Sequence, residues 1–369
     1  MSDHPDILIV GLGPAGASAA AAAARAGVRV MAIDRRKAAG LPVQCAEFVP
    51  RMLGADVVAV NRSRIQGITR MDTYLMGDLP EVTPDFQGVM IDRAAFDAAL
   101  VDEAIAAGAD VHFNTPLREI GPKGAIIGDG LPVRPRLVIA ADGPRSRVGR
   151  AMGLVNREMV ETRQIRVPMS EAHAATDIFL NPKIEGGYAW LFPRGAEANL
   201  GLGLVPSRKA RLRPLLDELH KALVADGRVG ETASRLTGGP IPVGGIIGLR
   251  GKIGDIPALL AGDAAGLANP ITGAGISSAT ASGRMAGDAA AAWLKGDADA
   301  LDDYAEEVND LFGPSLHLAL KRRQELVDTY ETRGEPEPSA LRAGWIAYPE
   351  YWARPEAAPT DRQMEALHP

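Results

Sequence analysis

The fold is decided by the stretch Asp6-Ile7-Leu8-Ile9-Val10-Gly11-Leu12-Gly13-Pro14-Ala15-Gly16. Its first five residues form a short apolar run, which is typical of a buried parallel strand. The alanine-rich residues that follow predict a helix up to Ala26, and Gly27 ends it. A second strand over 28–33 ends at Asp34. Together these segments predict a βαβ unit.

The glycines of this stretch have the GxGxxG spacing of a dinucleotide-binding turn. Gly11 permits a tight turn, Gly13 lets the backbone approach a pyrophosphate, and Gly16 lets helix and strand pack closely. The helix N-terminus offers unpaired N–H groups to the phosphates. Asp34 follows Gly16 by 18 residues and is expected to accept hydrogen bonds from ribose hydroxyls. The predicted cofactor site also includes the flanking residues Pro14, Ala15 and Arg35. A glycine turn without a nucleotide is the structural alternative.

Length and composition narrow the class of protein. The 369 residues exceed what one hydrophobic core usually organises, so we expect two coupled domains. The net charge is −6 without a basic block, which argues against a nucleic-acid partner. Cys45 is the single cysteine and the six histidines are scattered, so neither a disulfide nor a metal site is predicted. No apolar stretch of roughly 20 residues occurs, so we expect a cytoplasmic protein, with peripheral membrane contact left open.

Two further strand-to-turn units resemble the first. The strand 137–141 leads into Asp142-Gly143, and the strand 258–261 leads into Gly262-Asp263 and then a helix of small residues from about 273 to 294. A helix over 93–107 precedes a short strand over 110–113. Alternating segments in 64–90 and 156–250 favour an antiparallel sheet.

These segments predict an α/β fold (α+β overall), with a Rossmann-like parallel-sheet domain and an inserted antiparallel-sheet domain. The first domain comprises 1–63, 91–155 and 251–300, and the substrate domain comprises 64–90 and 156–250. An amphipathic helix over 301–332 and a tail of low regular structure from Arg333 make up the rest. The sequence gives no indication of the oligomeric state.

The order of these glycine motifs resembles the glutathione-reductase-type FAD fold of hydroxylase and reductase flavoproteins. The resemblance implies that FAD is the cofactor and that Asp263 touches its pyrophosphate and ribityl chain. It also places Arg93 near the ribityl chain and phosphates, and Asp142 and Gly143 in the cofactor site. Physically, the small residues Gly273, Ala274 and Gly275 would let backbone N–H groups approach the flavin N1/O2 edge.

Two segments point to a narrower resemblance. In Gly186-Gly187-Tyr188-Ala189-Trp190-Leu191-Phe192-Pro193, the three aromatic residues share one face of a strand, a pattern that also suits an ordinary sheet core. Together with Pro42-Val43-Gln44-Cys45-Ala46-Glu47, this segment resembles the geranylgeranyl reductase family. The resemblance implies that Tyr188, Trp190 and Phe192 line an isoprenoid pocket over the flavin, and that Cys45 and Ala46 lie beside the flavin. Family members often have glycine where this chain has Ala46.

The implied reaction adds a hydride from reduced flavin to one carbon of a C=C bond and a proton to the other. Cys45 is a candidate proton donor, and an inert buried cysteine is the alternative. Glu47 is expected to be a solvated or structural carboxylate rather than a general acid. Arg322 and Arg323 are predicted to form a solvated basic face, which an anionic lipid headgroup could use.

Other functions share these motifs. A flavin monooxygenase or halogenase acting on an aromatic substrate would have the same cofactor signatures. A non-catalytic prenyl carrier is a third candidate. The sequence does not identify the electron donor, since no second GxGxxG in Rossmann context occurs. NADPH that binds transiently and reduced ferredoxin are both left open.

Overall fold

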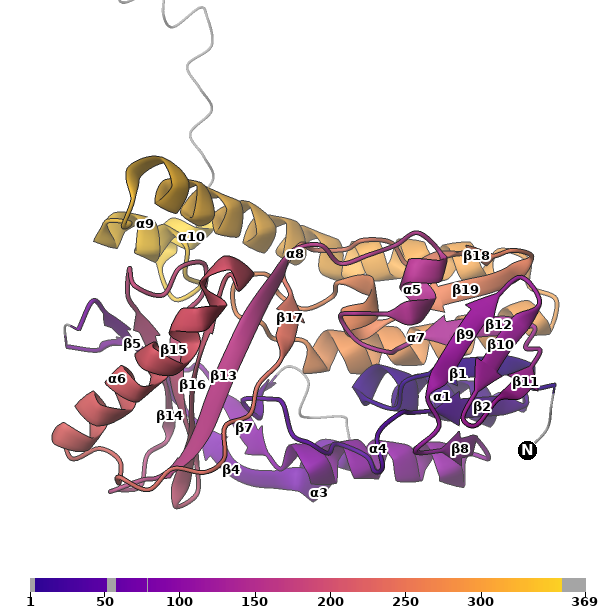
Figure 1. Ribbon diagram of the computed structural model, residues 1–369, viewed down its shortest axis with the longest axis horizontal. Helices are drawn as coiled ribbons and strands as arrows, with labels where there is room; N and C mark the ends of the chain where they lie inside the picture. Colours follow the sequence, from indigo (N-terminus) through magenta and orange to yellow (C-terminus); the bar gives the residue numbers. More distant parts are fainter. Residues whose placement is uncertain (1–3, 52–57, 78, 354–369) are drawn as a thin grey trace, which may run out of the picture.

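The computed structural model describes residues 4–51, 58–77 and 79–353 (Figure 1). Its first sheet has the strand order β18-β19-β12-β1-β2-β8. The strands are β1 (Ile7–Val10), β2 (Val30–Ile33), β8 (Asp110–His112), β12 (Leu137–Ala140), β18 (Arg250–Ile253) and β19 (Ile256–Leu260). All neighbours pair in parallel except β18 and β19. The three predicted strand-to-turn units therefore share one sheet, as expected, and β1, β2 and β12 are buried along their whole length.

Three helices accompany this sheet: α1 (Pro14–Arg25), α4 (Arg93–Ala106) and α7 (Ile276–Leu294). Small residues let α1 and α7 approach closely, because a Cβ atom added at Gly283 would lie 2.1 Å from the Ala15 carbonyl oxygen. The helix expected from about Gly273 begins only at Ile276. A 3₁₀ turn, η2 (Gly262–Ala265), and a loop precede it, so the glycine-rich segment 273–275 is the approach to α7.

The second large sheet has the order β17-β13-β16-β15-β14-β5-β6. Its strands are β5 (Arg70–Leu75), β6 (Glu81–Thr83), β13 (Met159–Pro168), β14 (Ala175–Leu180), β15 (Ala189–Arg194), β16 (Glu197–Leu204) and β17 (Pro240–Pro242). The sheet is antiparallel as predicted, apart from the parallel pair of β14 and β5. One face packs against the amphipathic helix α6 (Leu212–Ala225), which follows η1 (Pro206–Arg211) and buries Leu212, Leu216 and Leu223.

Two three-stranded sheets complete the β structure. One consists of β3 (Phe48–Pro50), β7 (Gly88–Ile91) and β4 (Arg64–Ile68), and α3 (Val58–Ser63) leads into it. The other consists of β9 (Leu117–Gly121), β10 (Gly124–Ile127) and β11 (Leu131–Val133), a meander that the sequence reasoning did not predict. The short helix α5 (Arg147–Ala151) follows β12. The division into domains stays a prediction.

The C-terminal part is more ordered than expected. Helix α8 (Ala300–Arg333) runs along both large sheets in Figure 1. The predicted tail of low regular structure instead contains α9 (Pro338–Ala343) and α10 (Pro349–Trp352), and its residues Trp345, Tyr348 and Tyr351 are buried. Residues 354–369 of that tail lie outside the described residues. Among the helices of the described residues, none combines the length and apolar character that a bilayer crossing requires.

Candidate active site

A cavity of about 810 Å³ lies next to both large sheets, a volume in the upper range for small-molecule sites. Residues of both sheets line it. Of the predicted site residues, these line the cavity: Gly11, Gly13, Pro14, Ala15, Asp34, Arg35, Cys45, Ala46, Arg93, Asp142, Gly143, Tyr188, Trp190, Phe192, Asp263, Gly273, Ala274 and Gly275. Gly16 and Gly262 do not line it and pack against neighbouring atoms instead. The structure thus brings the predicted cofactor-binding residues and the predicted aromatic pocket residues to one cavity.

The glycine turn has the shape that a pyrophosphate requires. Gly11 has a φ of +98°, and a Cβ atom there would lie 2.2 Å from the Ala141 carbonyl oxygen. A Cβ atom at Gly16 would lie 1.8 Å from the Gly11 carbonyl oxygen, so helix and turn need both glycines. At Gly13, by contrast, a Cβ atom would meet nothing within 4 Å. Gly13 is also the N-cap of α1 and no side chain caps that helix, so the open space and the positive helix end fit a phosphate group.

Asp34 has a role in the turn that sequence reasoning missed. Its carboxylate accepts hydrogen bonds from the backbone N–H groups of Leu12 at 2.8 Å and Arg36 at 2.7 Å. These bonds tie the end of β2 to the glycine turn. Each carboxylate oxygen has a further lone pair, so Asp34 still fits the predicted ribose contact.

A second set of charged groups lies around the cysteine segment. The Arg93 guanidinium donates to Asp97 at 2.7 Å and also interacts with the Cys45 sulfur. Burial alone would lower the pKa of Arg93, but Asp97 and Cys45 more than offset burial, so this pKa lies above its usual range. Burial raises the pKa of the Asp263 carboxyl, and Arg93 opposes this only in part. The Cys45 sulfur accepts a hydrogen bond from the Glu47 N–H at 3.2 Å.

Of the two roles expected for Glu47, the structural carboxylate is the one observed. The prediction of a solvated carboxylate is wrong, because the side chain is buried. Its side chain is 1% exposed and accepts from Arg194 at 3.0 Å, Asn199 at 2.9 Å and Arg166 at 3.2 Å. Its other oxygen accepts from the Arg93 N–H at 3.0 Å. Glu47 has a φ of +68°, an unfavourable conformation for a non-glycine residue that these contacts hold in place. Glu47 therefore joins the cysteine segment to α4 and to the second sheet.

The aromatic residues of β15 and the residue before it form one wall of the cavity. The Tyr188 and Trp190 rings lie 5.7 Å apart, and those of Trp190 and Phe192 lie 6.4 Å apart. The Tyr188 hydroxyl donates to the Thr272 carbonyl oxygen at 2.7 Å, next to the glycine-rich approach to α7. Since burial raises the pKa of Tyr188 above its usual range, this hydroxyl keeps its proton at neutral pH.

Several residues of this wall were not predicted. Trp190 donates to the Gln164 side chain at 3.1 Å, and Gln164 in turn donates to the Cys45 carbonyl oxygen at 3.1 Å. Further rings extend the wall, with Phe48 packing 5.9 Å from Phe192 and Trp345 packing 4.7 Å from Tyr188. A signal for Trp345 was present, because four of the 17 aromatic residues fall within 345–352. Gln164 carried no sequence signal.

The predicted solvated face of Arg322 and Arg323 is wrong, since both side chains are buried. Arg322 donates to the Tyr351 carbonyl oxygen at 2.9 Å and the Glu350 carbonyl oxygen at 3.2 Å, which holds the α10 segment against α8. Arg323 donates instead to the Gly186 carbonyl oxygen and lines the cavity. Helical spacing alone does not distinguish a solvated arginine pair from one covered by a later segment.

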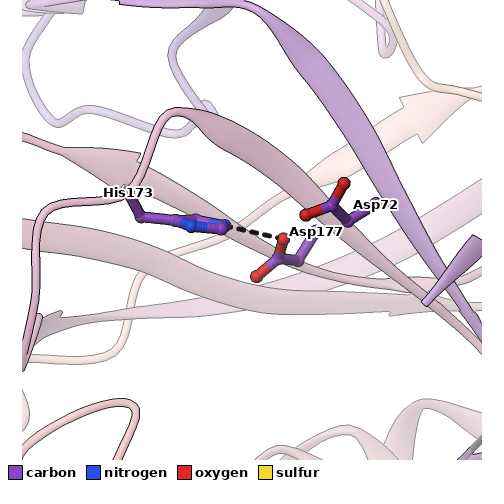
Figure 2. Close-up of side chains that lie close together, drawn as sticks. All are labelled: Asp72, His173 and Asp177. Carbon is purple, nitrogen blue, oxygen red and sulfur yellow. Dashed lines mark hydrogen bonds and ion pairs between the residues drawn. The ribbon is translucent and has the colours of Figure 1, made fainter. Parts of the chain in front are cut away.

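Asp72, His173 and Asp177 form a separate cluster whose ligand-type atoms lie within 4.8 Å of one another (Figure 2). None of the three lines the cavity. His173 Nε2 lies 2.8 Å from Asp177 Oδ1, Arg70 donates to Asp72 at 2.9 Å, and Arg228 donates to Asp177. Two guanidinium groups balance the two carboxylates, so the cluster is an ion-pair network that joins β5 to β14.

The residues present fit a flavin dinucleotide. The turn at Gly11–Gly16 accommodates phosphates, Asp34 lies at the end of β2, and the segment before α7 approaches the cavity with small residues. The Asp142 carboxylate, whose pKa burial raises, accepts from Ser146 and from the Arg147 N–H, which fixes the turn after β12. A Cβ atom at Gly275 would lie 3.1 Å from an Asp263 carboxylate oxygen, so glycine keeps these two groups in contact.

Comparisons with known proteins show relatives that match most of the chain. No protein-family model matches the chain. It is 32% identical over 358 residues to a digeranylgeranylglycerophospholipid reductase of Methanocella arvoryzae, covering 88% of each chain. It is 35% identical over 340 residues to digeranylgeranylglycerophospholipid reductase 2 of Methanopyrus kandleri, covering 86% of this chain and 85% of that one.

Solved structures share the fold. A geranylgeranyl bacteriochlorophyll reductase-like protein of Thermoplasma acidophilum superposes with a TM-score of 0.76 at 25% identity, covering 99% of both chains. The flavin-dependent halogenase CmlS has a TM-score of 0.64 at 18% identity over 99% of this chain and 70% of its own, a likeness of fold alone. From the extended match to the reductases and the site described above, we conclude that the chain belongs to the geranylgeranyl reductase family of FAD-dependent oxidoreductases.

Proposed function

We propose that this protein reduces C=C bonds in the prenyl chains of a digeranylgeranylglycerophospholipid or a closely related isoprenoid lipid. The observation that carries the proposal is that the glycine turn of a dinucleotide site and a wall of aromatic side chains line the same cavity. A long apolar chain fits such a wall, because it buries apolar surface without polar partners. The names of the relatives support the same substrate class.

The residues proposed to hold FAD are those of the glycine turn, Asp34, Arg93, Asp142, Asp263 and the segment Gly273–Gly275. When bound and reduced, FAD supplies a hydride equivalent to one carbon of a C=C bond. The part of the chain around the aromatic wall has two tasks. It holds the prenyl segment in place, and it keeps water away from the reacting carbons.

Cys45 is the residue we propose to deliver the proton. Cys45 lines the cavity, its sulfur accepts a hydrogen bond from the Glu47 N–H, and Arg93 interacts with the sulfur. The Sγ hydrogen would pass to the second carbon of the double bond, and solvent would return a proton to the sulfur. The hydrogen bond from Gln164 to the Cys45 carbonyl oxygen couples this position to Trp190, so the proposed donor and the aromatic wall keep a fixed relation.

Two further parts of the proposal concern partners. NADPH or reduced ferredoxin would reload the flavin.

Peripheral contact with a membrane would let a lipid substrate enter, and the hairpin of β5 and β6 presents apolar side chains for such contact. Leu79 is 88% exposed, and Met76 and Val82 are about half exposed. Co-sedimentation with lipid vesicles, compared between the wild type and Leu79→Asp, tests this contact. The variant should no longer co-sediment, while its rate on detergent-dispersed lipid should stay unchanged.

The deciding experiment incubates the reduced, FAD-loaded protein anaerobically with geranylgeranyl lipids. Mass spectrometry should show a gain of about 2 Da for each bond reduced. A protein that changes no prenyl lipid, but consumes NADPH with oxygen when an aromatic compound is added, would instead be a monooxygenase or halogenase. Purified protein that is colourless near roughly 450 nm and binds prenyl lipid would be a carrier.

A further inference from the structure

Arg323 is a buried cation that forms no ion pair within the described part of the chain. It belongs to α8, its side chain is 7% exposed, and it lines the cavity. Its Nη1 donates to the Gly186 carbonyl oxygen at 2.5 Å, and its other N–H groups have no hydrogen-bond partner among the described residues. No carboxylate oxygen of those residues lies within 4 Å of it. A guanidinium carries five N–H donors, so most of its hydrogen-bonding capacity is unused.

Two other arginines, Arg322 and Arg93, differ from Arg323 because each has an ionic partner. Arg322 donates to three carbonyl oxygens and to Glu325, and Arg93 is paired with Asp97. Burial lowers the pKa of Arg323 to about 10, and the distant charge of Glu158 offsets this only in part. Arg323 is still protonated at neutral pH. An uncompensated buried charge is costly, so such a group is expected to meet an anion when the site is filled.

The location of Arg323 indicates which anion. It contacts Gly186, which immediately precedes Gly187 and Tyr188 at the start of the aromatic wall. Phosphate-binding features of the glycine turn belong to the first sheet, whereas Gly186 leads into β15 of the second sheet. An anion at Arg323 would therefore belong to the molecule that lies along the aromatic wall.

We propose that Arg323 binds a phosphate oxygen of the lipid headgroup, so that the substrate enters with its anionic end at Gly186 and its prenyl chain along Tyr188, Trp190 and Phe192. This inference rests on the proposed function. Arg323 thereby sets the orientation of the lipid, and the distance of each double bond from the headgroup decides which bonds reach the flavin side of the cavity. A hydrogen bond from Arg323 to a charged oxygen is of the strong, charge-assisted kind.

The test compares a prenyl glycerophosphate with its dephosphorylated counterpart, which has the same chains. The FAD-loaded wild-type protein should show a KM about 10- to 100-fold lower for the phosphorylated lipid, the range for a hydrogen bond to a charged group. Arg323→Gln should abolish this preference by raising only the KM of the phosphorylated lipid. Arg323→Lys should keep part of it. The matched control is Lys321→Gln, which removes an exposed charge one position before Arg322 and should change neither KM.

Binding of a geranylgeranyl phosphate, measured by calorimetry on the same variants, separates this inference from the proposed function. If the wild type binds the phosphate and Arg323→Gln does not, the anion site holds even where no lipid is reduced. Equal KM increases for both lipids would overturn it and assign Arg323 to support of the Gly186 turn. A wild type without preference, or a loss of FAD rather than lipid affinity in Arg323→Gln, would overturn it as well.

Discussion

Replacing Glu47 by glutamine removes one charge from the ion-pair cluster that connects the cysteine segment to the second sheet. Glutamine keeps the shape and one oxygen, but Arg194 and Arg166 lose their shared carboxylate. Breaking a buried ion pair by removing one partner costs about 3–5 kcal/mol. Arg166 is 32% exposed and can be rehydrated, so we expect the lower end, about 3 kcal/mol. With an unfolding entropy of about 2.1 cal/mol/K per residue, this lowers Tm by about 4 °C.

Thermal unfolding of the FAD-loaded protein by calorimetry measures this shift. The matched control is Glu197→Gln, since Glu197 also pairs with Arg166, at 3.8 Å, but is 49% exposed. A surface pair of this kind contributes at most about 1 kcal/mol, so Tm should change by about 1 °C or less. The Glu47 side chain also fixes the backbone whose N–H bonds the Cys45 sulfur, so its loss of ion pairs in Glu47→Gln should lower the reduction rate as well. Equal, small Tm shifts in the two variants would refute the assignment of Glu47 as a structural link.

Three other substitutions test separate parts of the site. Cys45→Ser should lower the rate of alkene reduction by about 100-fold or more, as for loss of a general acid, with flavin absorbance unchanged; an unchanged rate would show an inert cysteine. Gly201→Ala places a Cβ atom 2.4 Å from Trp190, so the ring must move and kcat/KM for prenyl lipid should fall about 10-fold while FAD binding persists, as measured by steady-state kinetics and flavin fluorescence. Asp263→Asn should weaken the pH dependence of the free energy of unfolding of the FAD-free protein, measured by urea titrations. The folded pKa of Asp263 is raised above 3.8, so the folded protein binds this proton more tightly than the unfolded chain, and stability falls as pH rises from about 4 through the folded pKa.

The first sheet could be predicted because its signals are local. Short apolar runs that end in glycine turns identify β1, β12 and β19, and buried parallel strands need few other cues. The meander β9–β11 was missed, since its strands are three to five residues long and most of their residues are not buried. Local pattern carries little information about such strands.

The residues of the candidate site could be predicted where a local sequence motif includes them, as it does Gly11 and Trp190. It was not predictable where the contact depends on segments far apart in sequence. Gln164 joins Trp190 to Cys45, and Trp345 covers Tyr188 from a segment that composition describes as a tail. Arg322 and Arg323 looked solvated because their partners, at 350–353 for Arg322 and at Gly186 for Arg323, are far away in sequence and leave no trace in helical periodicity.

Helix α8 has a consequence for how this protein can change in evolution. Near one end the Tyr304 hydroxyl donates to the Leu260 carbonyl oxygen of β19 at 2.6 Å, and farther along Arg323 donates to Gly186. Nineteen residues of helix separate the two contacts, roughly 28 Å at 1.5 Å per residue. Inserting or deleting one residue between them would turn Arg323 by roughly 100° about the helix axis, away from the cavity. We therefore expect natural homologues to vary in amino-acid identity at the exposed positions of this stretch but to keep its length constant.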